Sequence, residues 1–290
     1  MIGSSPSPAR RRALALAAAI GFVVAGAVAA ATLLDSSSSS SSEAGDSAAA
    51  GPAATPAGPG AYVALGDSYS SGVGAGSYLR ESGACLRSRR AYPHGLGRPV
   101  TLFRACGGAR TADVLSGQLA PFPAGTRLVT ITIGGNDAGF ADVLERCLFG
   151  SPEACGRRVD AAERFVRRAL AARLRRVYAA IRERAPHATV VVAGYPRLFA
   201  GRPWCGPVGT IDEREQRRLN AGADLLARTI AAEVRRHRGF RFADVREAFD
   251  GGGVCAASPR ILGATRPAFA SFHPTARGQA TYARVIRRRL

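Results

Sequence analysis

Lysine is absent from this 290-residue sequence, so all 40 basic residues are arginine. Together with the abundance of alanine and glycine, this absence points to the codon usage of a GC-rich genome. The formal net charge is +19, and the basic and acidic residues of segment 1–60 balance, so the whole excess lies in residues 61–290. Such a charge favours either attraction to an anionic partner or a solvated, codon-biased surface. We favour the second interpretation, because the arginines are spread along predicted helix faces.

Several motifs are also missing, and each absence removes a class of function. No zinc-finger spacing, RNA-recognition aromatics or helix-turn-helix pattern accompanies the arginines, which argues against a nucleic-acid partner. Gly72–Gly76 (GVGAG) lacks the G-x-G-x-x-G spacing of a dinucleotide site. The segment Gly66–Ser68 does not match the G-x-S-x-G elbow, which argues against an α/β-hydrolase.

The cysteines and histidines show no metal-ligand spacing. The six cysteines form no C-x-x-C pair, and the four histidines are widely separated, so we expect neither a metal nor another cofactor. An even number of cysteines in an exported chain favours disulfides, and the sequence alone leaves fifteen pairings open.

Composition divides the chain into three parts. Residues 1–34 carry three arginines followed by the apolar run Ala13–Leu34, which predicts a cleaved signal peptide or a membrane tether through residues 13–34. Residues 35–60 are rich in Ser, Ala, Pro and Gly and predict a flexible linker. Residues 61–290 have the length and composition of one catalytic domain. Either interpretation of the N-terminus places this domain outside the cell, secreted or at the cell surface.

Short apolar strands alternate with amphipathic helices in residues 61–290. Near-continuous apolar strands suggest burial on both faces, and the alternation predicts a three-layer α/β/α sandwich with a central parallel sheet. We expect strands at 62–65, 100–103, 128–133, 188–193 and 240–242, and helices at 159–181, 212–237 and 275–290.

Chemically capable residues follow the expected strands. Ser68 directly follows the first strand, Gly108 follows the second and Asn136 the third, while His273 precedes the last helix. Taken singly, each has an ordinary explanation as a helix cap or a tight turn. Taken together, they place a hydroxyl, an imidazole, a main-chain N–H and an amide at the edge where parallel α/β sheets form their sites.

This order of motifs closely resembles the SGNH (GDSL-like) hydrolase family: Gly66-Asp67-Ser68, then a glycine block, then Gly134-Gly135-Asn136-Asp137, then a late histidine. The resemblance covers about residues 61–290 and implies a flavodoxin-like fold. It implies Ser68 as nucleophile, His273 as base, and an oxyanion hole made by the N–H groups of Ser68 and Gly108 and the side chain of Asn136.

The cysteine pattern resembles the actinobacterial secreted lipase/esterase branch of that family. This resemblance implies the pairs Cys85–Cys106, Cys147–Cys155 and Cys205–Cys255. One feature departs from the family pattern: many members have an aspartate three positions before the histidine, where this chain has Ala270. We therefore expect a dyad in which the main-chain carbonyl of Ala270 orients His273. The alternative is that Asp244 or Asp250 takes the place of the missing acid.

The predicted activity is hydrolysis of small-molecule or lipid acyl esters by a monomeric enzyme. The apolar segment 195–210 is a candidate wall for the acyl chain. The same machinery also serves phospholipases, thioesterases and carbohydrate deacetylases. A catalytically silent module that binds an anionic surface through its arginines is the alternative from another class.

Overall fold

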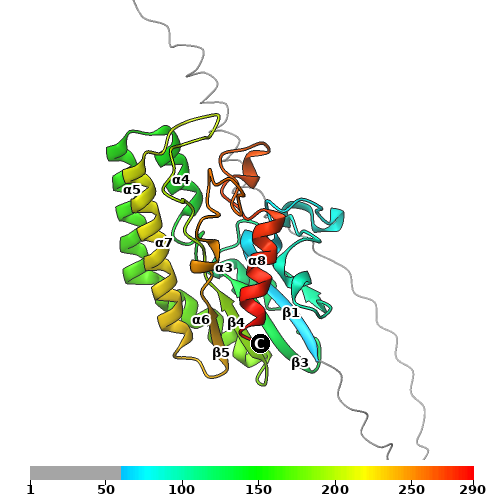
Figure 1. Ribbon diagram of the computed structural model, residues 1–290. Helices are drawn as coiled ribbons and strands as arrows, with labels where there is room; N and C mark the ends of the chain where they lie inside the picture. Colours follow the sequence, from blue (N-terminus) through cyan, green and yellow to red (C-terminus); the bar gives the residue numbers. More distant parts are fainter. Residues whose placement is uncertain (1–59) are drawn as a thin grey trace, which may run out of the picture.

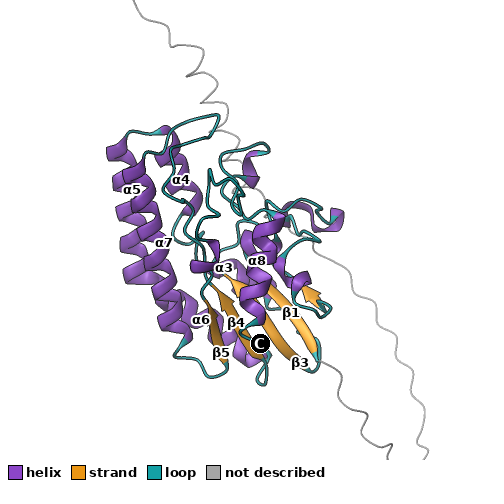
Figure 2. Ribbon diagram, viewed as in Figure 1, coloured by secondary structure: helices purple, strands orange, loops and turns teal. Residues whose placement is uncertain are grey.

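The computed structural model describes residues 60–290, whose centre is a sheet of five parallel strands (Figure 1, Figure 2). The spatial order is β2-β1-β3-β4-β5, so the chain crosses over the sheet between strands. All five predicted strands are present, within a few residues of the expected bounds: β1 (Ala61–Gly66), β2 (Leu102–Phe103), β3 (Thr126–Thr132), β4 (Thr189–Ala193) and β5 (Phe240–Ala243).

The strands are buried on both faces, as their unbroken apolar pattern predicts. Val129, Thr130 and Ile131 in β3 are fully buried, and so are Val190, Val191 and Val192 in β4. The edge strand β2 is shorter than expected, because Thr101 bonds to β1 partly through its side chain. Its N–H donates to the Tyr62 carbonyl at 2.9 Å, while its Oγ1 accepts from the Tyr62 N–H at 3.1 Å.

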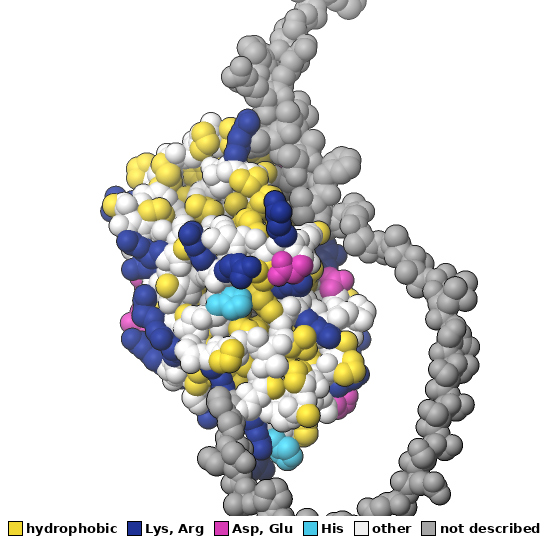
Figure 3. All heavy atoms as spheres, turned by 90° about the vertical axis from the view of Figure 1, so that its right-hand side faces the viewer, with side chains coloured by type: hydrophobic (Ala, Val, Ile, Leu, Met, Phe, Trp, Pro, Cys, Tyr) yellow, Lys and Arg dark blue, Asp and Glu magenta, His cyan; other side chains and the backbone are white. Residues whose placement is uncertain are grey.

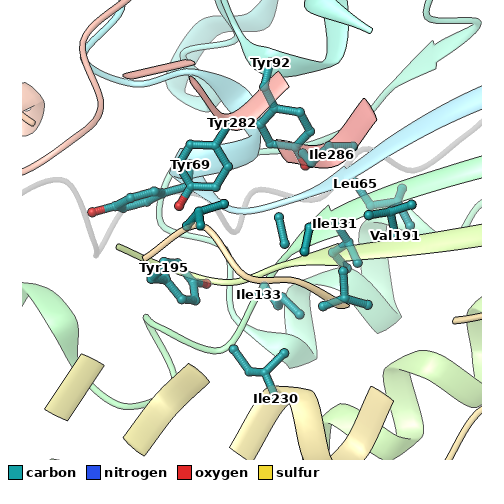
Figure 4. Packing of buried hydrophobic residues seen from close by; sticks show 14 of the residues in the cluster. Leu65, Tyr69, Tyr92, Ile131, Ile133, Val191, Tyr195, Ile230, Tyr282 and Ile286 are labelled. Atoms are coloured by element: carbon teal, nitrogen blue, oxygen red, sulfur yellow. The ribbon is translucent and has the colours of Figure 1, made fainter. Parts of the chain in front are cut away.

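Helices cover both faces of the sheet, which completes the predicted three-layer sandwich. Figure 4 shows Ile286 of the C-terminal helix on one side of strand residues Leu65 and Ile131, and Ile230 on the opposite side. The helices of ten residues or more are α4 (Phe140–Phe149), α5 (Pro152–Phe165), α6 (Ala171–Arg184), α7 (Glu213–Val234) and α8 (Ala276–Arg287).

Local sequence signals set the helix boundaries. Asp212 caps α7 in a reciprocal capping box with Glu215, and Thr275 caps α8 by accepting from the Gly278 N–H. The predicted helix 159–181 extends further in both directions. A π-helical turn at Val166–Leu170 joins α5 to α6, so its apolar stripe continues over Leu170 and Leu174 into the core.

Three disulfides join Cys85 to Cys106, Cys147 to Cys155 and Cys205 to Cys255, the same pairs that the family resemblance implies. The first ties the loop after β2 to the preceding segment, the second links α4 to α5, and the third closes a separation of 50 residues. Cross-linking that longest loop stabilises the fold by about 4 kcal/mol in the chain-entropy view.

The expected N-terminal segments 1–34 and 35–60 lie outside the described residues, apart from Gly60. Within residues 60–290, no helix has the length and hydropathy needed to cross a membrane. Figure 3 shows arginine side chains scattered among apolar and uncharged groups on one face of the molecule.

Candidate active site

Ser68 lies at the carboxyl end of β1, where the chain turns sharply into the short helix α2 (Ser68–Ser71). The turn requires glycine at position 66: its φ is 118°, and a Cβ there would lie 2.3 Å from the Thr132 carbonyl oxygen. Asp67 is the N-cap of α2, and its Oδ1 accepts from the Tyr69 N–H at 3.0 Å. The motif thus acts as a helix cap and also presents the Ser68 hydroxyl at the sheet edge.

His273 contacts Ser68 although 205 residues separate them in the chain. Its Nε2 lies 2.8 Å from the Ser68 Oγ. Its Nδ1 lies 2.9 Å from the main-chain oxygen of Ser271. Since a carbonyl only accepts, Nδ1 carries the proton and Nε2 offers its lone pair to the Ser68 hydroxyl.

The expected role of Ala270 is therefore wrong. The Ala270 carbonyl accepts from the main-chain N–H of His273 at 3.3 Å instead of from the ring. A left-handed conformation at Phe272, with φ of 61°, reverses the chain next to His273, and the carbonyl that the ring contacts is that of Ser271. The suggested acids do not orient the histidine either: Asp244 pairs with Arg246 at 2.6 Å and Asp250 with Arg197 at 3.7 Å.

Burial keeps His273 neutral. Desolvation lowers the pKa of His273 to about 4, and its hydrogen bonds to the carbonyls of Ser271 and Phe269 offset only part of that shift. At neutral pH the imidazole is therefore free to accept a proton.

Gly108 and Asn136 lie on neighbouring loops that face the same pocket as Ser68 and His273. One N–H of the Asn136 amide donates to the Ala109 carbonyl at 3.0 Å, which fixes the side chain against the Gly108 loop. The structure thus brings together all four residues that the sequence singles out.

Asp137 holds these two loops together, a role that the sequence analysis missed. Its Oδ2 accepts from the Thr111 N–H at 2.9 Å and its Oδ1 from the Thr111 hydroxyl at 2.6 Å. Arg173 on α6 completes the contact at 3.2 Å from Oδ1. The sequence does show an acidic residue at the end of the G-G-N-D motif. It could not show the role of that residue, because its partners Thr111 and Arg173 are distant along the chain.

A second buried hydrogen-bond network holds Asp67, the residue that precedes Ser68. Asp67 accepts from Thr132 at 2.6 Å and from the hydroxyl of Tyr195, which itself accepts from the Gly135 N–H at 3.2 Å. Burial raises the pKa of Asp67 to about 6 against these hydrogen bonds. Figure 4 shows Tyr69 and Tyr195 close together in this region, where their rings pack edge to face. No sequence signal marked Tyr195 as part of this network.

The pocket at Ser68 has mostly apolar walls. An adjacent apolar pocket shares Phe140 and Leu144 with it. Of the expected acyl wall 195–210, Tyr195, Pro196 and Leu198 line this second pocket. The walls of the Ser68 pocket come instead from other segments: Val73, Leu86, Phe140, Leu144, Leu148 and Phe269.

An α/β/α sandwich with a serine and a neutral histidine in contact at the carboxyl edge of its sheet has the architecture of a serine hydrolase. The chain belongs to the GDSL-like Lipase/Acylhydrolase family, whose model matches residues 64–281.

Individual relatives agree with this assignment. Lipase 1 of Streptomyces coelicolor is 47% identical over 238 residues, which cover 80% of this chain and 87% of the relative. A crystal structure of an extracellular lipase from Streptomyces rimosus has 45% identity and a TM-score of 0.72, covering 78% of this chain and 98% of that one. Phospholipase A1 from Streptomyces albidoflavus NA297 has 42% identity and a TM-score of 0.75, covering 80% and 99%. This chain is a carboxylic-ester hydrolase of the lipase/esterase type.

Proposed function

We propose that this protein is an exported serine esterase or lipase that cleaves acyl esters through an acyl-enzyme on Ser68, with His273 as the base. The observation that carries the proposal is the 2.8 Å contact between Ser68 Oγ and His273 Nε2 in a pocket that Gly108 and Asn136 also line.

Acylation begins when Nε2 of His273 takes the Ser68 proton as Oγ attacks the ester carbonyl carbon. The negative charge that develops on the carbonyl oxygen is stabilised by the N–H groups of Ser68 and Gly108 and by the amide of Asn136. His273 then returns the proton to the departing alcohol. In deacylation the same nitrogen activates a water molecule, which attacks the acyl carbon and regenerates Ser68.

The Ser271 carbonyl takes the place that an acid has in a triad. It holds the Nδ1–H tautomer and the ring orientation, and its dipole partly stabilises the imidazolium that forms in the transition state. A carbonyl carries no net charge, so this stabilisation is weaker than that of a carboxylate. The dyad therefore relies more on orientation than on charge.

The walls of the pocket support acyl chains as the group bound beside Ser68. Leu86, Leu144 and Phe269 offer a broad apolar surface, whereas Glu145 and Ser271 are the only polar side chains lining this pocket besides Ser68, Asn136 and His273. Such a mostly apolar wall favours an acyl chain over a sugar, whose many hydroxyl groups each need a partner. Lipase and phospholipase names among the relatives point the same way.

Export is part of the proposal. Three disulfides persist in an oxidising compartment, and the structural relative from Streptomyces rimosus is described as extracellular.

Replacing Asn136 with alanine is expected to lower kcat by about 10²- to 10³-fold with little change in KM, because the amide acts on the developing oxyanion. Asn136→Asp is expected to lose at least as much, since it removes the same donor and brings a negative charge to the oxyanion. Steady-state kinetics with p-nitrophenyl butyrate measure both, and near-UV circular dichroism checks the fold. A change confined to KM would remove Asn136 from the oxyanion hole.

A fluorophosphonate inhibitor tests the acyl-enzyme directly. We expect one equivalent to inactivate the enzyme and peptide mass spectrometry to place the adduct on Ser68. A series of p-nitrophenyl esters from acetate to palmitate, run beside acetylated xylan, then tests the substrate class, and we expect turnover of the acyl esters only. An adduct elsewhere would overturn the assignment of Ser68, and inertness towards every ester would favour a binding module.

A further inference from the structure

A groove that carries several charged side chains adjoins the Ser68 pocket at the Gly108 loop. Ala84, Gly107 and Gly108 line both, so the groove and the pocket share the loop that contains Gly108. Its charged lining residues are Arg87, Arg104, Arg110 and Asp113, which leaves a net charge of +2 from three arginines and one aspartate. We call this surface the arginine groove.

The guanidinium groups of the arginine groove have no carboxylate partner within 4 Å among residues 60–290. Arg87 and Arg104 are half-buried and Arg110 is exposed. Burial lowers the pKa of Arg87, and the more distant Glu81 offsets this only in part. By contrast, the half-buried Arg246 lies within 2.7 Å of both Asp244 and Asp224, and their hydrogen bonds raise its pKa.

The frame of the groove is rigid. The disulfide Cys85–Cys106 lies in its wall and joins the segment that carries Arg87 to the loop that follows Arg104. The Gly107 N–H donates to the Cys85 carbonyl at 3.0 Å and braces the same two segments. The arginines are thus attached to a preformed frame, which lowers the entropic cost of gathering them round an anion.

We propose that the arginine groove binds the anionic phosphate headgroup of a glycerophospholipid whose acyl chain occupies the Ser68 pocket. This inference rests on the proposed function and names its substrate class. Phosphate on the glycerol backbone lies on the alcohol side of the scissile ester, opposite the acyl chain. The mostly apolar Ser68 pocket suits the acyl chain and the cationic groove suits the phosphate, and the two surfaces meet at Gly108. Arginine guanidinium groups bind phosphate through paired, charge-assisted hydrogen bonds.

The test must separate binding in the groove from general attraction of a basic protein to anionic membranes. Monomeric short-chain substrates do so: dihexanoyl phosphatidic acid and the uncharged dihexanoyl glycerol, both below their aggregation concentrations. We expect kcat/KM of the wild type to favour the phosphatidic acid by about tenfold, mainly through KM, and added salt to weaken the preference.

The triple variant Arg87→Gln, Arg104→Gln, Arg110→Gln is expected to bring the ratio of the two kcat/KM values close to one. Arg110→Gln alone changes an exposed residue and is expected to lower the ratio in part without risk to folding. Arg228→Gln, which removes an exposed arginine from α7, is the matched control and is expected to keep the wild-type ratio. A wild-type ratio near one, or a ratio that survives the triple substitution, would overturn the inference.

Inorganic phosphate distinguishes a lipid headgroup from free phosphate as the ligand. A competitive inhibition constant at least tenfold above the KM for dihexanoyl phosphatidic acid supports the headgroup, whereas one below that KM would make the groove a site for free phosphate. If dihexanoyl glycerol is cleaved without any preference, only this inference fails. If no ester is cleaved, the proposed function fails and this inference fails with it.

Discussion

Ser68→Ala is expected to lower kcat/KM for p-nitrophenyl butyrate by roughly 10⁵-fold, because it removes the atom that forms the acyl-enzyme. The methyl group left behind cannot attack the ester, and the residual rate comes from substrate binding and the oxyanion donors. Binding is expected to survive, because the apolar pocket walls are unchanged.

The matched control for this change is Ser151→Ala. Ser151 caps α5 by accepting from the Ala154 N–H at 3.3 Å, and it does not line the pocket. Its loss is expected to reduce the free energy of unfolding by about 1 kcal/mol and to leave kcat/KM within a factor of two. Turnover of Ser68→Ala within tenfold of the wild type would show that another group performs the chemistry.

His273→Ala is expected to cause a loss of similar size, because a serine hydroxyl without its base is a poor nucleophile. Ser271→Ala provides a sharp comparison. Among residues 60–290, the Ser271 side chain hydrogen-bonds only to Thr265, while its main-chain carbonyl accepts from the His273 ring. The alanine keeps that carbonyl, so we expect less than about a tenfold loss. A loss as large as that of His273→Ala would mean that the hydroxyl, and not the carbonyl, orients the ring.

The pH dependence of the wild type follows from the same histidine. Since burial lowers the pKa of His273 to about 4, the base stays neutral far below the usual range for histidine. We expect kcat/KM to remain level from pH 8 to about pH 5 and to fall below that as Nε2 becomes protonated. Because the pKa of Asp67 is itself raised to about 6, a midpoint near 6.5 that persists in Asp67→Asn would show that the His273 ring is solvated in the free enzyme.

Stability offers an independent measurement of that pKa. Between about pH 6.5 and pH 4 the unfolded chain protonates His273 while the folded one does not, so acidification costs the wild type up to about 3 kcal/mol through this residue. His273→Ala lacks that cost. As the pH falls from 6.5 to 4, the stability of His273→Ala relative to the wild type is therefore expected to rise by up to the same amount. Urea denaturation at the two pH values measures both free energies of unfolding.

Several features could be predicted from the sequence because they depend on local pattern. Buried parallel strands are apolar on both faces, so the runs that became β3 and β4 were recognisable. Helix caps such as Asp212 and Thr275 act on groups three residues away, and both lie at the first residue of the helices expected at 212–237 and 275–290. Strand ends share one edge of a parallel sheet, which is why Ser68, Gly108 and Asn136 were expected together.

Other features depend on contacts between distant segments. Every residue has a main-chain carbonyl, so no sequence pattern could predict that the His273 ring contacts the carbonyl of Ser271 and not that of Ala270. The left-handed conformation at Phe272 places the Ser271 carbonyl at the ring. The network of Asp67 and Tyr195 spans 128 residues, and the arginine groove joins segments that only the fold and the Cys85–Cys106 disulfide bring side by side.

The sequence by itself determined which chemical groups this protein has and in what order they follow the strands. The tertiary structure decided which of these groups lie close together: the Ser271 carbonyl and the His273 ring, the Asp137 carboxylate and Thr111 between the Gly108 and Asn136 loops, and the arginines beside the Ser68 pocket. The physical reason is the short range of hydrogen bonds, which require donor–acceptor distances of about 3 Å. Residue spacing along the chain does not fix such distances between distant segments, whereas a packed core does.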